Sequence, residues 1–166
     1  MILAEVEGPT TVAAWRHALR RVQQRYPLPS ARVHKNPGER PYFETLPDAH
    51  LPLRVMRLGE ADLDELIAQE PVTSFGYGDR PSARVTLCHS LERSVILLSA
   101  HHVATDGKTN VRIVEDLMAA VSGEDLGDPS PLLPALGDFF GLGQPQAYVE
   151  LSPAKAPPSR FRLNLP

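Results

Sequence analysis

One continuous stretch, residues 94–107, reads SVILLSA followed by HHVATDG, and the rest of the chain is arranged around it. Its first half, residues 94–100, is an apolar run of strand length, which predicts a buried strand. Its second half, residues 101–107, contains paired histidines, an aspartate and a glycine. Apolar residues at helical spacing then predict an amphipathic helix over 108–121. Polar residues gathered at a strand-to-helix junction indicate a functional site rather than an accident of packing.

The bulk composition is that of a soluble globular protein, and the length fits one domain or part of a larger one. The chain has 166 residues, of which 42% are hydrophobic and 22% are charged. A formal charge of −3 argues against nucleic acid and anionic membranes as partners. The single cysteine, Cys88, excludes an internal disulfide and a cysteine-based zinc site. No apolar run reaches the roughly 18 residues of a membrane span, and the first residues lack a signal-peptide pattern, so a cytoplasmic location is expected.

Strand and helix patterns alternate ahead of the motif. Period-two or apolar runs predict strands over 2–7, 31–34, 42–44, 51–58 and 83–89. Helical spacing and capping residues predict helices over 11–25 and 60–69. The expected fold is an α/β two-layer sandwich, in which helices near 11–25, 60–69 and 108–121 cover one side of a mixed β-sheet.

Proline usage divides the chain. Eight of the 17 prolines follow residue 128. We therefore expect a motif-bearing subdomain over 1–126 and a proline- and glycine-rich linker over 127–158, with at most one short helix near 132–140. Alternation returns over 159–166, which is expected to begin a second subdomain that this chain otherwise lacks.

Three other features have structural interpretations. Trp15, at helical spacing with apolar neighbours, is expected in the core, and Cys88 is expected to be a buried structural thiol. The arginines between 16 and 25 are expected to form a solvated helix face. A docking patch for a carrier protein is the alternative for these arginines.

The motif residues have the right chemistry for proton transfer. An imidazole can accept a proton from a hydroxyl, amine or thiol near neutral pH, which makes His102 a candidate base. Side chains that alternate along a strand would send His101 and His102 to opposite faces, so one would act and the other support. Asp106 could orient an imidazole or bind a distant arginine, for which Arg84 is a candidate. Gly107 would permit a tight turn and the close approach of a ligand.

Two other interpretations of the motif remain open. Adjacent histidines and an aspartate are metal-ligand types, although opposite strand faces argue against shared coordination. Alternatively, these are hydrogen-bonded core histidines followed by a capping aspartate, with no catalytic role.

Residues 101–107 fit the pattern HHxxxDG and resemble the chloramphenicol acetyltransferase-like acyltransferases. This superfamily includes the condensation domains of nonribosomal peptide synthetases and polyketide-associated acyltransferases. The resemblance extends to residues 8–28, with Tyr26 where histidine is frequent, to residues 80–87 (RPSARVTL), and to Lys108-Thr109 after the motif. It covers residues 2–126, the N-terminal subdomain of such a domain.

The resemblance implies a role for each motif position. His102 matches the catalytic histidine, which deprotonates the acceptor or positions the reacting groups, and His101 matches the histidine that supports it. Asp106 matches a structural acid that pairs with an arginine, and Gly107 matches a glycine whose backbone lines the acyl-donor channel. No bound cofactor or metal is implied. The donor would be a thioester on coenzyme A or on the phosphopantetheine of an acyl or peptidyl carrier protein, and an amine or hydroxyl would attack it.

The family's channel runs between two subdomains, of which this chain carries the first. The expected function is therefore acyl transfer, or condensation, in nonribosomal peptide or polyketide biosynthesis, with the other wall supplied by a second subdomain or a second copy. The isolated chain is not expected to be a complete enzyme. The alternatives are a non-catalytic half-domain that binds a carrier protein or scaffolds a partner, and a histidine–aspartate metal hydrolase.

Overall fold

The computed structural model describes residues 1–38, 41–45, 50–76, 78 and 80–129. The chain divides into two compact units, residues 1–130 and 131–166, and the described residues belong to the first. The strands are β1 (Ile2–Glu7), β2 (Arg32–His34), β3 (Tyr42–Glu44), β4 (Leu53–Arg57), β5 (Ala83–His89) and β6 (Arg93–Ala100). The α-helices are α1 (Val12–Arg25), α2 (Leu63–Gln69) and α3 (Gly107–Val121), with short 3₁₀ turns η1 (Leu28–Ser30) and η2 (Leu58–Glu60). The helix predicted near 132–140, nearly all of the linker and the C-terminal strand lie outside the described residues.

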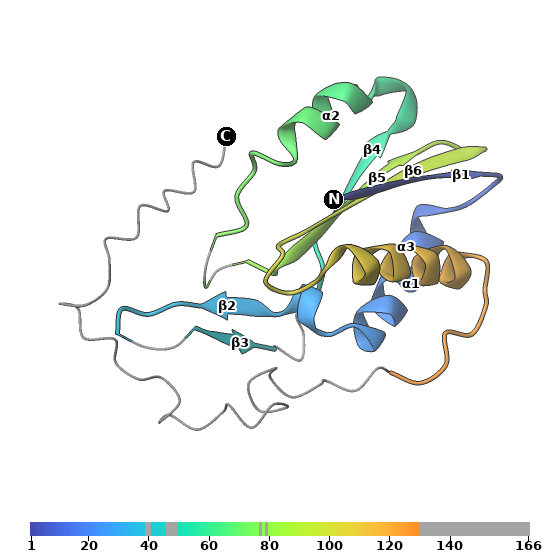
Figure 1. The fold of residues 1–166 in the computed structure, drawn as a ribbon. Helices are drawn as coiled ribbons and strands as arrows, with labels where there is room; N and C mark the ends of the chain where they lie inside the picture. Colours follow the sequence, from blue (N-terminus) through green and yellow to red (C-terminus); the bar gives the residue numbers. More distant parts are fainter. Residues whose placement is uncertain (39–40, 46–49, 77, 79, 130–166) are drawn as a thin grey trace. The chain divides into compact units, whose positions relative to one another are not determined.

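The central sheet is mixed, as predicted. It has four strands in the order β1-β6-β5-β4 (Figure 1). The edge strand β4 runs parallel to β5, whereas β6 is antiparallel to both β5 and β1. Strands β2 and β3, both predicted as strands, form a separate antiparallel pair. This order places the motif-bearing strand β6 at the centre of the sheet, between two antiparallel neighbours.

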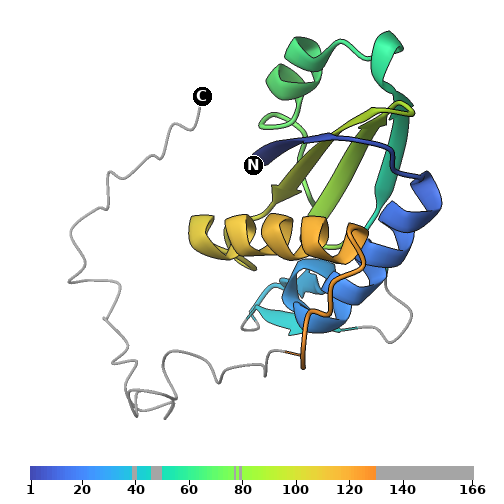
Figure 2. The same ribbon diagram turned by 90° about the vertical axis from the view of Figure 1, so that its right-hand side faces the viewer.

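The main core lies between one face of the sheet and the helices α1 and α3. Figure 2 shows the two helices side by side against this face. Their apolar stripes meet alternate residues of β5 and β6. The most deeply buried members are Trp15, Val22, Val85, Leu87, Ile96, Leu98, Ile113 and Leu117. Burial of each such side chain contributes about 1.5–3 kcal/mol. Trp15 is therefore a core residue, as predicted, and its indole N–H donates to Thr10 Oγ1 at 3.0 Å.

Helix α2 covers the opposite face of the sheet, so the expectation that all three helices share one side is wrong. Its buried residue Leu66 packs with Cys88 and Val95, which point away from the α1 and α3 side. Figure 2 shows α2 beyond that face. Strand β5 is buried along nearly its whole length, because both of its faces are covered. Cys88 is a buried thiol, and desolvation raises its pKa, in keeping with a structural role.

The helices on the main face are tied to each other near the C-terminus of α1. The hydroxyl of Tyr26 donates to Asp116 of α3 at 2.7 Å, and the Arg25 guanidinium pairs with the same carboxylate at 3.0 Å. The N-terminus of α1 is capped by Thr11, whose hydroxyl accepts from the Ala14 backbone N–H. Because α3 begins directly after the motif, these contacts also help to hold the motif loop in place.

Candidate active site on the motif loop

The motif occupies the connection between the central strand β6 and the helix α3. The strand ends at Ala100, a turn follows over residues 102–104, and α3 begins at Gly107. The Ala104 backbone N–H donates to the His101 carbonyl at 3.0 Å and closes the turn. Strand alternation therefore stops before His102, and the argument that the two histidines must occupy opposite strand faces does not apply.

His101 is held in place at the start of the loop. Its backbone N–H donates to the Ser82 carbonyl at 2.7 Å, which extends the pairing of the last residues of β6. Its ring nitrogen Nδ1 accepts from the Val103 N–H at 3.1 Å, and its ring meets Phe75 edge-on, with centroids 6.0 Å apart. An Nδ1 that accepts leaves the ring proton on Nε2 in the neutral form. The ring is thus oriented from two sides.

His102 lies in the turn and is exposed, in contrast to the half-buried His101. Its neighbour Val103 is also exposed, with 47% of its surface accessible, although valine is usually buried. The next residue, Ala104, is buried and anchors the turn. His102 and Val103 therefore form the tip of the loop, where an imidazole is open to an approaching substrate or partner.

Asp106 caps the helix instead of pairing with an arginine. Its carboxylate accepts from the Thr109 backbone N–H at 2.7 Å. Hydrogen bonds from the backbone and side chain of Thr109 lower the pKa of Asp106, and nearby His102 and Lys108 act in the same direction. Within the described residues, no arginine forms an ion pair with Asp106, so the expected Arg84–Asp106 contact is wrong. Cap geometry accounts for the difference, because a carboxylate at this position is turned toward the free N–H groups of the helix.

Gly107 is the first residue of α3, and its φ lies outside the left-handed region. A Cβ built at this position would meet no atom within 4 Å. The tight turn expected at Gly107 is therefore absent. Close packing against the described residues does not require glycine here either. The space beside the Gly107 backbone is open.

Arg84 belongs to a different polar cluster, which reaches His101 through an aromatic ring. Its guanidinium bonds to the Glu70 carboxylate at 2.7 Å, and to the carbonyls of Glu70 and Thr73. It also lies over the Phe75 ring, 4.2 Å from the centroid, and the same ring makes a T-shaped contact with His101. The pair of Arg84 and Glu70 is largely buried. This cluster could not be predicted from the sequence, since nothing in residues 70–75 distinguishes them from an ordinary loop.

One hollow lies beside the cluster of Arg84 and Phe75, and another adjoins the motif loop. The first, of about 300 Å³, is mostly apolar and is lined by Pro52, Thr73, Phe75, Arg80, Pro81, Ala83 and Arg84. The second is a shallow depression of about 460 Å³ that starts at the motif glycine and follows the exposed side of α3, lined by Gly107, Lys108, Val111, Arg112 and Glu115. The sequence analysis did not foresee either hollow. The depression is open to solvent and directly adjoins the motif.

The described residues contain no group of three histidine, cysteine, aspartate or glutamate side chains placed to hold a metal ion. The metal interpretation of the motif therefore has no ligand set in this part of the chain. In the same part, no helix combines the length and apolar character needed to cross a membrane.

Comparison with known proteins identifies the fold. No protein-family model matches the chain. It is 28% identical over 124 residues to tyrocidine synthase 3 of Brevibacillus parabrevis. Among solved structures, it superimposes on the first condensation domain of the calcium-dependent antibiotic synthetase with a TM-score of 0.63 and 22% identity, over 77% of this chain and 34% of that one. The X-domain from teicoplanin biosynthesis matches with a TM-score of 0.66 and 22% identity, over 82% and 31%.

The chain therefore has the fold of a condensation-domain-like N-terminal half. The resemblance drawn from the motif is confirmed at the level of the fold. The chain spans about a third of the solved structures that it matches and 2% of tyrocidine synthase 3, while 74% of its own length is matched there. In this condensation-domain-like half, the motif loop lies at the end of the central strand, with His102 exposed and His101 and Asp106 held at either side.

Proposed function

We propose that this condensation-domain-like half contributes to acyl transfer, with His102 at the reacting centre. The exposure of His102 between two hydrogen-bonded ends of the loop carries the proposal, because a general base must reach its substrate and be held in place. The donor is an acyl thioester on a carrier-protein phosphopantetheine or on coenzyme A, and the chain itself binds no cofactor or metal.

In the proposed step, an amine or hydroxyl of the acceptor attacks the thioester carbonyl. The new C–N or C–O bond forms, the C–S bond breaks and the thiol leaves. His102 takes the proton from the nucleophile, or it holds the nucleophile in position. The proton ends on the departing sulfur, which leaves as a thiol. His101 acts as a positioning residue, Asp106 holds the C-terminal end of the loop, and the open backbone at Gly107 leaves room for the thioester arm along the depression beside α3.

The second wall of the site comes from a second subdomain or a second copy in this proposal, and the donor arrives on a carrier protein. The test is therefore made on the chain joined to, or mixed with, that second subdomain, by following thiol release from acyl-thioester donors. His102→Ala should lower turnover by about 100-fold or more, the range typical of lost general acid–base assistance. His17→Ala, an exposed histidine on α1, is the matched control and should leave turnover unchanged.

Because His102 is exposed, its replacement by alanine should leave the melting temperature as it is. A full rate in His102→Ala would remove the catalytic assignment. A lost rate together with a lowered melting temperature would instead indicate a folding defect, and circular dichroism of both variants distinguishes these outcomes.

A second candidate function is a non-catalytic module that binds a carrier protein or scaffolds a partner. It is favoured by one specific likeness: the X-domain from teicoplanin biosynthesis, which has a similar fold, has been solved in a complex with OxyB. Under this alternative, the chain should bind an acyl-carrier or peptidyl-carrier protein with the same affinity in wild type and His102→Ala. No acyl transfer should then follow on addition of the second subdomain.

A further inference from the structure

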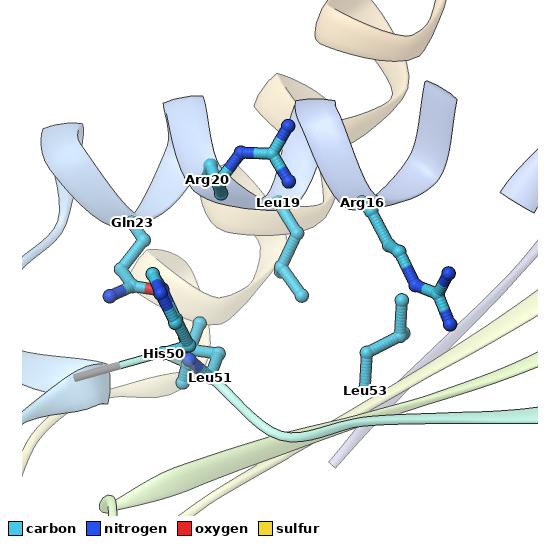
Figure 3. A pocket seen from close by; sticks show the side chains of 7 residues that line it. All are labelled: Arg16, Leu19, Arg20, Gln23, His50, Leu51 and Leu53. Carbon is cyan, nitrogen blue, oxygen red and sulfur yellow. The ribbon is translucent and has the colours of Figure 1, made fainter. Parts of the chain in front are cut away.

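A pocket between α1 and the segment that enters β4 lies apart from the motif loop. Its volume is about 210 Å³, and its lining residues are Arg16, Leu19, Arg20, Gln23, His50, Leu51 and Leu53. Figure 3 shows Leu19 and Leu53 facing each other between helix and strand, while Arg16 extends from α1 toward the strand. The described lining residues thus combine an apolar floor with cationic groups, and none of them is acidic.

The floor of the pocket is formed by buried side chains of the core. Leu19 and Leu51 are 6% and 4% exposed, and both belong to the main core. Gln23 joins the two walls, because its side-chain oxygen accepts from the Leu51 backbone N–H at 3.0 Å. A cavity of roughly 150 Å³ lined by apolar side chains is large enough for benzene. This pocket therefore has room for a small ring or a short branched chain.

The rim of the pocket holds two positive charges that no carboxylate of the described residues neutralises. Helix α1 carries four arginines. Arg21 bonds to Asp125 and to the Glu124 carbonyl, and Arg25 pairs with Asp116. Arg16 and Arg20, the two in the pocket, are exposed and have no ion pair with any carboxylate in the described part of the chain. They are four residues apart on one helix face, so their side chains emerge within about 5–6 Å of each other.

We infer that this pocket binds a phosphate monoester with a small apolar group. Two guanidiniums balance a phosphate dianion better than they balance a singly charged carboxylate, and each offers the planar fork that suits phosphate oxygens. His50 adds an imidazole at the opposite end of the pocket from Arg16 (Figure 3). The apolar group would lie on Leu19, Leu51 and Leu53, with the phosphate at the open rim. Local positive charge in a chain of formal charge −3 distinguishes this surface from a generally basic protein.

The test is a titration of the full chain with phenyl phosphate, followed by amide chemical shifts and calorimetry. Phenyl phosphate should bind about tenfold more tightly than inorganic phosphate, because only the former uses the apolar floor, and about tenfold more tightly than benzoate, which carries one charge. The double variant Arg16→Gln/Arg20→Gln should weaken phenyl phosphate binding by about tenfold or more. Arg57→Gln is the matched control, since Arg57 is an exposed arginine at the end of β4 outside the pocket, and it should leave phenyl phosphate binding unchanged.

Three outcomes would overturn the inference. The first is no binding of phenyl phosphate up to about 10 mM. The second is equal affinity for inorganic phosphate or benzoate, which would mean that charge alone, or the ring alone, is recognised. The third is equal affinity for phenyl phosphate in the double variant and in Arg57→Gln. Both substituted arginines are exposed, so the variants should keep the wild-type melting temperature, and the melt confirms that binding is compared between folded proteins.

Discussion

Two carboxylates near the motif, Glu70 and Asp106, have opposite surroundings. Glu70 is buried to 12% side-chain exposure against Arg84, which in turn lies on the Phe75 ring beside His101. Asp106 is exposed and satisfies the N-terminus of α3. The sequence motif suggested that one acid both holds the loop and pairs with an arginine, whereas two different carboxylates do so in the structure. The Arg84–Glu70 pair supports His101 through the Phe75 ring, whereas the motif aspartate caps the start of a helix.

The largest expected loss of stability follows from breaking the buried Arg84–Glu70 pair. Arg84→Met keeps the aliphatic stem but leaves the Glu70 carboxylate without its cation, which should lower the free energy of unfolding by about 3 kcal/mol. Arg112→Met, which breaks an exposed pair with Glu115, should change it by less than about 0.5 kcal/mol. Urea denaturation measures both. Equal small losses in the two variants would show that the Arg84–Glu70 pair is as weak as a surface contact.

A double-mutant cycle sharpens the same comparison by asking which carboxylate Arg84 interacts with. Cycles of Arg84→Met with Glu70→Gln and with Asp106→Asn should give coupling energies of about 1–3 kcal/mol and of less than about 0.5 kcal/mol, respectively. Residues in contact couple, whereas separated sites are additive. A strong coupling between Arg84 and Asp106 would restore the pairing that the sequence analysis expected and would contradict the observed cap.

The architecture was predictable because each element has a strong local signal. Observed element ends differ from the predicted ones by at most three residues, as at α2, where the expected start at 60 becomes Leu63. The side of the sheet that α2 covers was not predictable. Strand β5 is buried on both faces, but Cys88 shares its face with the polar residues Arg84 and Thr86, so the sequence does not mark this face as one that a helix covers. Only the tertiary arrangement decides that Leu66 packs on Cys88.

At the site, the motif predicted where the loop would lie, but not its conformation. The alternation of β6 suggested opposite faces for His101 and His102, whereas the hydrogen bond from Ala104 to the His101 carbonyl ends the strand first. The partner of Arg84 was equally hidden, because Glu70 precedes it by 14 residues in a segment without regular periodicity. The contacts between a loop and the strand beside it depend on side-chain packing, which residue spacing does not encode.

The smallest expected effect belongs to the exposed carboxylate. Asp106→Ala removes the acceptor for the Thr109 N–H and should lower the melting temperature by a few degrees, as is typical for a lost N-cap. Asp106→Asn is the matched control, because asparagine also caps helices and keeps an oxygen for the same N–H. Unchanged stability in Asp106→Ala together with lost acyl transfer would assign Asp106 to the chemistry and not to the helix.

The pH dependence of the same variants tests the cause of the cap's strength. Folding lowers the pKa of Asp106 below the ordinary value of 3.8, so the folded state holds the charged form more strongly than the unfolded chain does. The resulting stability is fully present above that value and is lost as the pH falls through the lower pKa of the folded state. Thermal melts between neutral pH and pH values below 3.8 should therefore show an acid-dependent loss in wild type that is smaller in Asp106→Asn. Identical acid profiles would mean that the Thr109 hydrogen bonds do not distinguish a charged from a neutral cap, and the cap would then act through geometry alone.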